Sequence, residues 1–197
     1  MKLRHLLSVL LLCFPVLVSA ETVDYDDLVQ TNGLFYKKLT SVPFTGKTSG
    51  QLQMTFKDGK QHGPFVWYHE NGQLWRKGTY KDGKEHGPHE RYHENGQLEG
   101  KVTYKEGKED GSSVWYYENG QLEGKVTYKD GKEHGPYESY YENGQLWSKQ
   151  TYKDGKKHGP SAWYHENGHL EANLTFKDGK TVNMTCFTET GTTEPCG

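Results

Sequence analysis

Aliphatic residues and long apolar runs are scarce in this chain of 197 residues. Hydrophobic residues make up only 32% of the sequence, and the longest uncharged apolar run is short, at residues 6–18. Dinucleotide-binding domains, barrel enzymes and helical bundles all need longer aliphatic segments, so the composition argues against them. A net charge of −2 provides no basic field for nucleic acid, and we expect no nucleic-acid partner.

Glycine and aromatic residues are abundant instead. The chain contains 24 Gly, 14 Tyr and 5 Trp, and the glycine content is about twice the usual share. Disordered chains are poor in aromatic residues, so this composition argues against disorder. It favours an all-β protein with many tight turns.

The first twenty residues have the three-part layout of a secretory signal. Two basic residues precede the apolar run, and small residues at positions 18–20 match the sites that a signal peptidase reads. We therefore expect cleavage between Ala20 and Glu21, and export of the mature protein to the periplasm or beyond. The run is shorter than the about 20 residues needed to span a bilayer. An uncleaved anchor and a lipoprotein modified at Cys13 are the alternatives.

Two cysteines, Cys186 and Cys196, would remain in the mature chain. An even pair in an exported protein is typical of a disulfide. This one would close a short loop in the C-terminal tail and stabilise the protein by about 2–3 kcal/mol. Two free thiols are the alternative.

Two glycine-containing turn signals each recur every 24 residues. Asn-Gly and Asp-Gly between strand-forming residues are strong hairpin signals, because a type I′ turn needs positive φ at both central residues. Each unit therefore contains two antiparallel strands and has no room for a helix. The first signal is Asn71-Gly72, Asn95-Gly96, Asn119-Gly120, Asn143-Gly144 and Asn167-Gly168; the second is Asp58-Gly59, Asp82-Gly83, Glu106-Gly107, Asp130-Gly131, Asp154-Gly155 and Asp178-Gly179.

This period divides the mature chain into three parts, and the expected fold class is an all-β, antiparallel β-hairpin repeat array. Residues 21–57, with a degenerate first repeat, are expected to cap the N-terminal end, and residues 178–197 the C-terminal end. Caps are needed because open strand edges invite aggregation. Between them, residues 58–177 form five units: 58–81, 82–105, 106–129, 130–153 and 154–177.

Two-residue loops at both turns would fix the register of the strands. They predict that Trp67 pairs with Arg76, His69 with Leu74, and Tyr80 with Glu85. One face then carries Trp67, Leu74, Tyr80 and their counterparts, and we assign this more apolar face to the packed side. The other face carries a row of tyrosines and lysines, unless a bulge exchanges the faces locally.

The residue after each leucine that follows the Asn-Gly turn varies between units. It is Trp75, Glu99, Glu123, Trp147 and Glu171 in turn, and the register places it on the tyrosine face. Exposed Trp and Tyr are favoured interface anchors. In the alternative interpretation they cover the sheet and stabilise cross-strand pairs. The predicted partner-binding residues are Tyr68, Trp75, Tyr92, Tyr116, Tyr140, Trp147 and Tyr164.

No residue pattern predicts catalysis, a metal site or a cofactor. Histidines recur at His62, His86, His134 and His158, but neighbouring copies would lie about 10 Å apart, whereas zinc ligands lie about 2 Å from one ion. Catalytic candidates likewise recur in every unit, although a catalytic site needs a unique constellation. We therefore expect a protein that is not an enzyme.

The unit DGKxHGPxxWYxENGQLxxKxTYK closely resembles the MORN repeat in its bacterial variant form, although the third unit has Asp110-Gly111-Ser112 in place of His-Gly-Pro. The segment from Leu34 to Gly46 resembles the lead-in of exported bacterial proteins called YwqK-family antitoxins. The first resemblance implies a hairpin array that binds proteins or lipids, and the second implies neutralisation of a toxic partner. The expected function is therefore an exported scaffold that binds a protein such as a toxin. The alternative is an envelope-associated module that binds lipid headgroups or cell-wall material.

Overall fold

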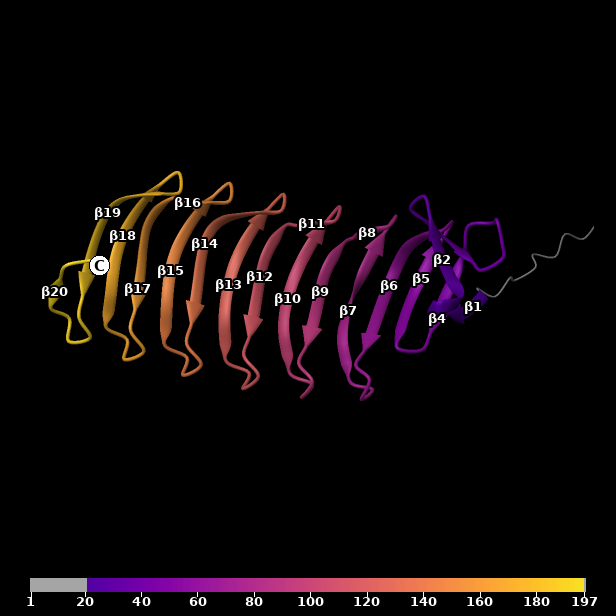
Figure 1. Cartoon of the computed structure of the whole chain (residues 1–197), viewed down its shortest axis with the longest axis horizontal. Helices are drawn as coiled ribbons and strands as arrows, with labels where there is room; N and C mark the ends of the chain where they lie inside the picture. The colour runs from indigo at the N-terminus through magenta and orange to yellow at the C-terminus, as the bar shows by residue number, and fades with distance from the viewer. Residues whose placement is uncertain (1–20, 197) are drawn as a thin grey trace, which may run out of the picture.

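The computed structural model describes residues 21–196, and 18 of the 20 strands in these residues form one long sheet. The expected signal, residues 1–20, lies outside the described residues, and so does Ala20 at its expected cleavage site. Figure 1 shows the strands side by side along the long axis, with turns at both long edges. This confirms the predicted all-β hairpin array. No helix in the part of the chain that the structure describes is long and apolar enough to cross a membrane.

Each repeat unit contributes one strand on either side of its Asn-Gly turn. The strands before this turn are β6 (Lys60–Tyr68), β8 with β9 (Lys84–Glu85, Gly87–Tyr92), β11 with β12 (Lys108–Glu109, Gly111–Tyr116), β14 (Lys132–Tyr140) and β16 with β17 (Lys156–Lys157, Gly159–Tyr164). The strands after it are β7 (Leu74–Lys81), β10 (Leu98–Lys105), β13 (Leu122–Lys129), β15 (Leu146–Lys153) and β18 (Leu170–Lys177).

The Asp-Gly turns have the predicted two-residue geometry. Asp82 and Gly83 have φ values of 51° and 84°, which are the positive values that a type I′ turn requires. Tyr80 pairs with Glu85 directly beyond the turn, as predicted.

The Asn-Gly turns contain three residues instead of the expected two. The His69 carbonyl accepts a hydrogen bond from the Gly72 amide (2.9 Å), and the His69 amide donates to the Gln73 carbonyl (2.8 Å). Residues 70–72 therefore form the loop, and Gly72 takes the left-handed conformation at its end (φ 83°). Three-residue loops of this kind are a common hairpin connection. The predicted pairing of His69 with Leu74 is therefore wrong.

A second irregularity restores the predicted register further along the strand. Tyr68 pairs with Leu74 and Trp67 with Arg76, which leaves Trp75 as the extra residue of a β-bulge. The same shift recurs in each of the other four units. Because a bulge changes the alternation of side chains, Leu74 lies on the face of Tyr68 and Trp75 on the face of Trp67. The predicted facing of these two positions is wrong for this reason.

Side chains at the Asn-Gly edge connect each unit to the next. The Asn119 Oδ1 atom accepts a hydrogen bond from the Gln121 amide (2.9 Å), and its Nδ2 atom donates to the Glu142 carbonyl in the next turn (3.2 Å). The Tyr117 hydroxyl donates to the Tyr140 carbonyl (2.7 Å). Equivalent bonds recur one unit later. Neighbouring units are thus coupled through side chains as well as through the strand ladder.

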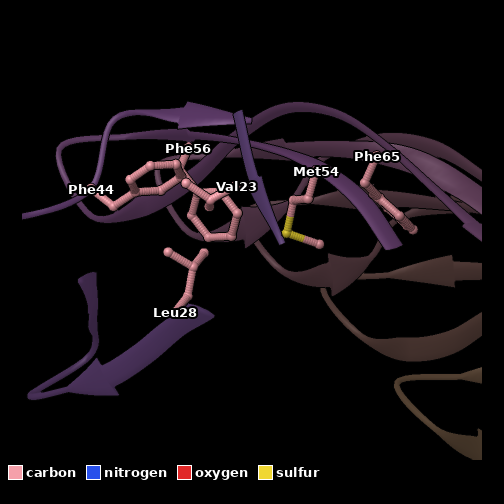
Figure 2. Close-up of a cluster of buried hydrophobic side chains, with 6 residues drawn as sticks. All are labelled: Val23, Leu28, Phe44, Met54, Phe56 and Phe65. Carbon is pink, nitrogen blue, oxygen red and sulfur yellow. The ribbon is translucent and has the colours of Figure 1, made fainter. Parts of the chain in front are cut away.

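The N-terminal segment covers the start of the array with the main cluster of buried hydrophobic residues. Strand β1 pairs in parallel with β4, and β2 and β3 form a separate hairpin. Figure 2 shows the cluster, which consists of Val23, Leu28, Phe44, Met54, Phe56 and Phe65. The elements of this segment are β1 (Glu21–Asp24), the 3-10 helix η1 (Tyr25–Asp27), β2 (Leu28–Thr31), β3 (Leu34–Lys37), β4 (Gly46–Ser49) and β5 (Leu52–Lys57).

The C-terminal end of the array consists of β19 (Lys180–Phe187) and the short strand β20 (Thr193–Glu194). A disulfide joins Cys186 to Cys196, whose Cα atoms lie 5.4 Å apart. It therefore fixes β20 against the last residues of β19, the edge strand to which β20 is paired.

We predict that replacing Asn119 by aspartate destabilises the protein by about 1 kcal/mol, because the turn acceptor remains while the donor to Glu142 is lost. Chemical unfolding measures the change. Asn71→Asp is the matched control, because Asn71 makes the bond within its turn but its amide nitrogen contacts no partner among residues 21–196. Equal losses in the two variants would contradict a role for the Asn119 bond between units.

Candidate binding face

The sheet has two unlike faces. We call the face that carries Trp67, Trp75 and Tyr80, with the equivalent residues of the other units, the aromatic face. The opposite face carries Tyr68, Lys77 and their equivalents, and we call it the lysine face. The second sheet, β2–β3, lies at the N-terminal end (Figure 1), so no second layer of described strands covers the later units.

The structure separates the predicted binding residues between these two faces. The rings of Trp75 and Trp67 lie 4.3 Å apart, which places Trp75 on the aromatic face. Trp147 occupies the same bulge position and lies beside Trp115 and Tyr137. The expectation that both tryptophans share a face with the tyrosine row is therefore wrong, because it did not include the bulge. The tyrosines are on the lysine face: Tyr68, Tyr92, Tyr116, Tyr140 and Tyr164.

On the lysine face, glutamates form ion pairs with lysines of the neighbouring strands. Glu90 lies between Lys77 (2.8 Å) and Lys101 (3.3 Å) and accepts a hydrogen bond from the Tyr92 hydroxyl (2.7 Å). These contacts lower the pKa of Glu90 to about 2, with the Lys77 hydrogen bond as the largest cause. Glu138 repeats the arrangement, and its pKa is also lowered to about 2. Two of the five predicted tyrosines, Tyr92 and Tyr140, thus support cross-strand ion pairs.

The lysine partners of Glu138 come from the strands on either side of it. Lys125 lies 2.7 Å and Lys149 3.4 Å from its carboxylate, and the Tyr140 hydroxyl donates to it at 2.7 Å. The clusters around Glu90 and Glu138 therefore each connect three strands. Contacts of this kind stabilise pairs of strands, as the alternative interpretation of the tyrosine row expects.

On the aromatic face, large rings stand beside small residues. Trp67 is 37% exposed and Trp147 is 45% exposed, both unusually high values for tryptophan in a sheet centre. Gly124 and Ser139 lie below the rings, and both are buried. A cleft of about 360 Å³ opens above them; it is lined by Trp115, Tyr117, Glu123, Gly124, Tyr137, Ser139, Tyr140 and Trp147.

Sequence reasoning missed this cleft and most of its residues. Its walls come from two neighbouring units, and its floor exists because Gly124 and Ser139 are adjacent across the strand pair β13–β14. With the correct register, the sequence would have shown these two small residues at paired positions, and this pairing is the signal of the cleft.

Two carboxylates on the aromatic face, Glu109 and Glu133, are partly buried. Burial raises the pKa of Glu109, and Glu85 and Glu133 raise it further. Burial also raises the pKa of Glu133. The neighbouring Tyr128 has a pKa raised to about 12, first by burial and then by Glu109 and Glu133. Burial therefore disfavours the charged form of these groups.

The repeated histidines lie beside the Asp-Gly turns. The Nδ1 atom of His62 lies 3.1 Å from an Asp82 carboxylate oxygen, and His134 and His158 make the corresponding contacts at 3.4 Å. In the third unit Asp110 takes this position and accepts a hydrogen bond from the Asp130 amide (3.2 Å). Residues 21–196 contain no group of three or more His, Cys, Asp or Glu side chains arranged to hold a metal. These three histidines thus each contact the aspartate of the next Asp-Gly turn along the chain.

We predict that acid destabilises the protein partly through Glu90 and Glu138. Because their pKa values are depressed in the folded state, their stabilisation is present above the usual carboxyl pKa and is lost as the pH falls towards about 2. Unfolding free energies measured between pH 5 and pH 2.5 should fall by about 1 kcal/mol more per site in the wild type than in Glu90→Gln/Glu138→Gln, after allowance for solvent screening.

The matched control for this pH dependence is Glu94→Gln, which removes a carboxylate from an exposed turn. It should keep the wild-type acid dependence. An acid dependence in the double variant as steep as that of the wild type would show that other groups cause it.

The five hairpin units match one known family. The model of the MORN repeat variant matches residues 61–82, 85–106, 109–130, 133–154 and 157–178, which together are more than half of the chain. No curated protein matches the sequence closely enough to count as a relative. Each family match runs from one Asp-Gly turn to the next and so contains one Asn-Gly hairpin. The chain therefore belongs to the MORN repeat variant family.

Proposed function

We propose that this protein is an exported scaffold that captures a protein partner on its aromatic face, and that the partner is a toxic protein which it neutralises. The observation that carries this proposal is the exposure of Trp67 and Trp147, at 37% and 45%, on a face without a covering layer. Exposed tryptophans surrounded by smaller residues are typical anchors of protein interfaces.

The family supports a binding role in place of catalysis. MORN repeats are generally non-catalytic binding modules. The His, Asp and Glu side chains near the Asp-Gly turns recur from unit to unit, whereas catalysis needs one distinct set of groups. On the aromatic face, by contrast, residues such as Trp75, Glu99 and Trp147 differ between equivalent positions, and such variation suits recognition, since specificity then comes from the pattern of side chains.

The proposals of export and of a toxic partner rest on features of the sequence. The layout of residues 1–20 is that of a cleavable signal, and the Cys186–Cys196 pair suits an oxidising compartment. The resemblance of residues 34–46 to the antitoxin lead-in supports a toxic partner. Steric capture would explain neutralisation without chemistry, because a bound scaffold covers the partner's functional surface.

The second candidate is an envelope-associated module that binds lipid headgroups or cell-wall material. The lysine rows favour it, and the single glutamate between each pair of lysines offsets only one of their two charges. The negative net charge of the chain, −2, nevertheless disfavours binding to an anionic surface.

The test uses the mature chain, beginning at Glu21, as bait in an affinity pull-down from the source organism. We predict one stoichiometric protein partner that is lost from Trp67→Ala/Trp147→Ala and retained by Lys101→Ala/Lys149→Ala, the control on the lysine face. Loss of the two anchors should weaken binding by about 2 kcal/mol or more. The partner should inhibit growth when expressed alone and not when co-expressed with the scaffold.

Full partner affinity in the tryptophan variant, with unchanged thermal stability, would contradict binding through the aromatic face. Co-sedimentation with vesicles and no protein partner would support the envelope-associated alternative.

A further inference from the structure

The cleft between the units 106–129 and 130–153 has rings on several sides. Trp115 and Tyr117 come from the first unit, and Tyr137 and Trp147 from the second. The residues that form it differ in the neighbouring units, so this combination of rings occurs once along the five repeats.

Three of these rings are fixed by neighbouring groups. The Tyr117 hydroxyl donates to the Tyr140 carbonyl (2.7 Å). The ring of Tyr137 lies 6.0 Å from that of Tyr152, and the ring of Trp147 lies 6.2 Å from that of Tyr141. The cleft is therefore largely formed before a ligand arrives, which lowers the cost of binding.

The floor of the cleft is small and offers few free polar groups. Gly124 is buried, and a Cβ atom at this position would lie 3.2 Å from the Glu138 carbonyl oxygen. Ser139 is 5% exposed, and its hydroxyl hydrogen bonds to the Ser148 hydroxyl at 2.6 Å. The floor therefore offers few free acceptors to the N–H donors of an ammonium or guanidinium group.

Glu123 gives the cleft a carboxylate without an internal partner. At the equivalent positions one unit earlier, Arg91 pairs with Glu99 at 3.1 Å. The arginine position is Trp115 in this unit, and Glu123 makes no ion pair with a described residue. A ring has thus replaced the cation of the earlier unit while the carboxylate remains.

We propose that this cleft binds an organic cation of the quaternary-ammonium class, such as a choline group. The positive N-methyl groups would lie against the faces of Trp115, Tyr137 and Trp147, where cation–π attraction acts. Glu123 would supply the counter-charge, and the absence of N–H donors on such a cation suits the polar-poor floor. This site goes beyond capture of a protein partner and does not depend on it.

The test is isothermal titration calorimetry of the mature chain with choline chloride and with 3,3-dimethylbutan-1-ol. The alcohol has the shape of choline without its charge. We predict that choline binds at one site and that the neutral alcohol binds at least about tenfold more weakly, in line with the worth of a cation–π contact. Equal affinities, or no binding of choline, would overturn the proposal.

Two variants locate the site. Trp147→Ala and Glu123→Gln should each weaken choline binding by about tenfold. Their matched controls are Trp75→Ala, at the same bulge position in another unit, and Glu94→Gln, in an exposed turn; both should leave choline affinity unchanged. Wild-type affinity in Trp147→Ala or Glu123→Gln, or equal losses in their controls, would overturn the assignment to this cleft.

Vesicles identify the source of the cation. If the ligand is a lipid headgroup, phosphatidylcholine vesicles should sediment the wild type and not Trp147→Ala, and phosphatidylglycerol vesicles should sediment neither. If only soluble choline binds, the site takes a free solute. The proposal would be overturned if choline did not bind and if both proteins bound both kinds of vesicle equally. That result would mean that another part of the protein surface, and not the cleft, contacts the vesicles.

Discussion

The left-handed backbone conformation at the glycine of each Asn-Gly turn is the constraint on which the rest of the structure depends. Gly72 and its equivalents, with φ near 83°, close a three-residue loop, and a non-glycine residue adopts this conformation only at a cost. The loop shifts the register by one residue, and the bulge at Trp75 shifts it back. Together they determine which residues lie on each face of the sheet.

The two faces then follow different physical rules. On the lysine face, Glu90 and Glu138 each form ion pairs with two lysines, one from each neighbouring strand. On the aromatic face, rings and small residues alternate, and Glu123 has no internal cation among the described residues. A single sheet without a second layer cannot bury these rings, so the array is stabilised by contacts between neighbouring units. The exposed rings therefore remain available for recognition.

Much of the fold could be predicted from the sequence, because Asp82-Gly83 and its equivalents permit one tight turn geometry with positive φ at both residues. The repeat period and the antiparallel strands follow from it. The facing of Trp75 and Trp147 could not be predicted, because Asn-Gly is compatible with both two-residue and three-residue loops. Nor could the cleft, because Trp115 and Trp147 belong to different units and meet only when the register is known. The N-terminal cluster around Phe56 depends on contacts with no periodic signal.

The bulge turns Trp75 onto the face of Trp67, and nuclear Overhauser contacts between assigned indole protons of the mature chain can verify this placement. We expect cross-peaks between Trp67 and Trp75, whose ring centroids lie 4.3 Å apart. Cross-peaks from Trp75 to Tyr68, with none to Trp67, would place Trp75 on the lysine face and show that the bulge does not exchange the faces.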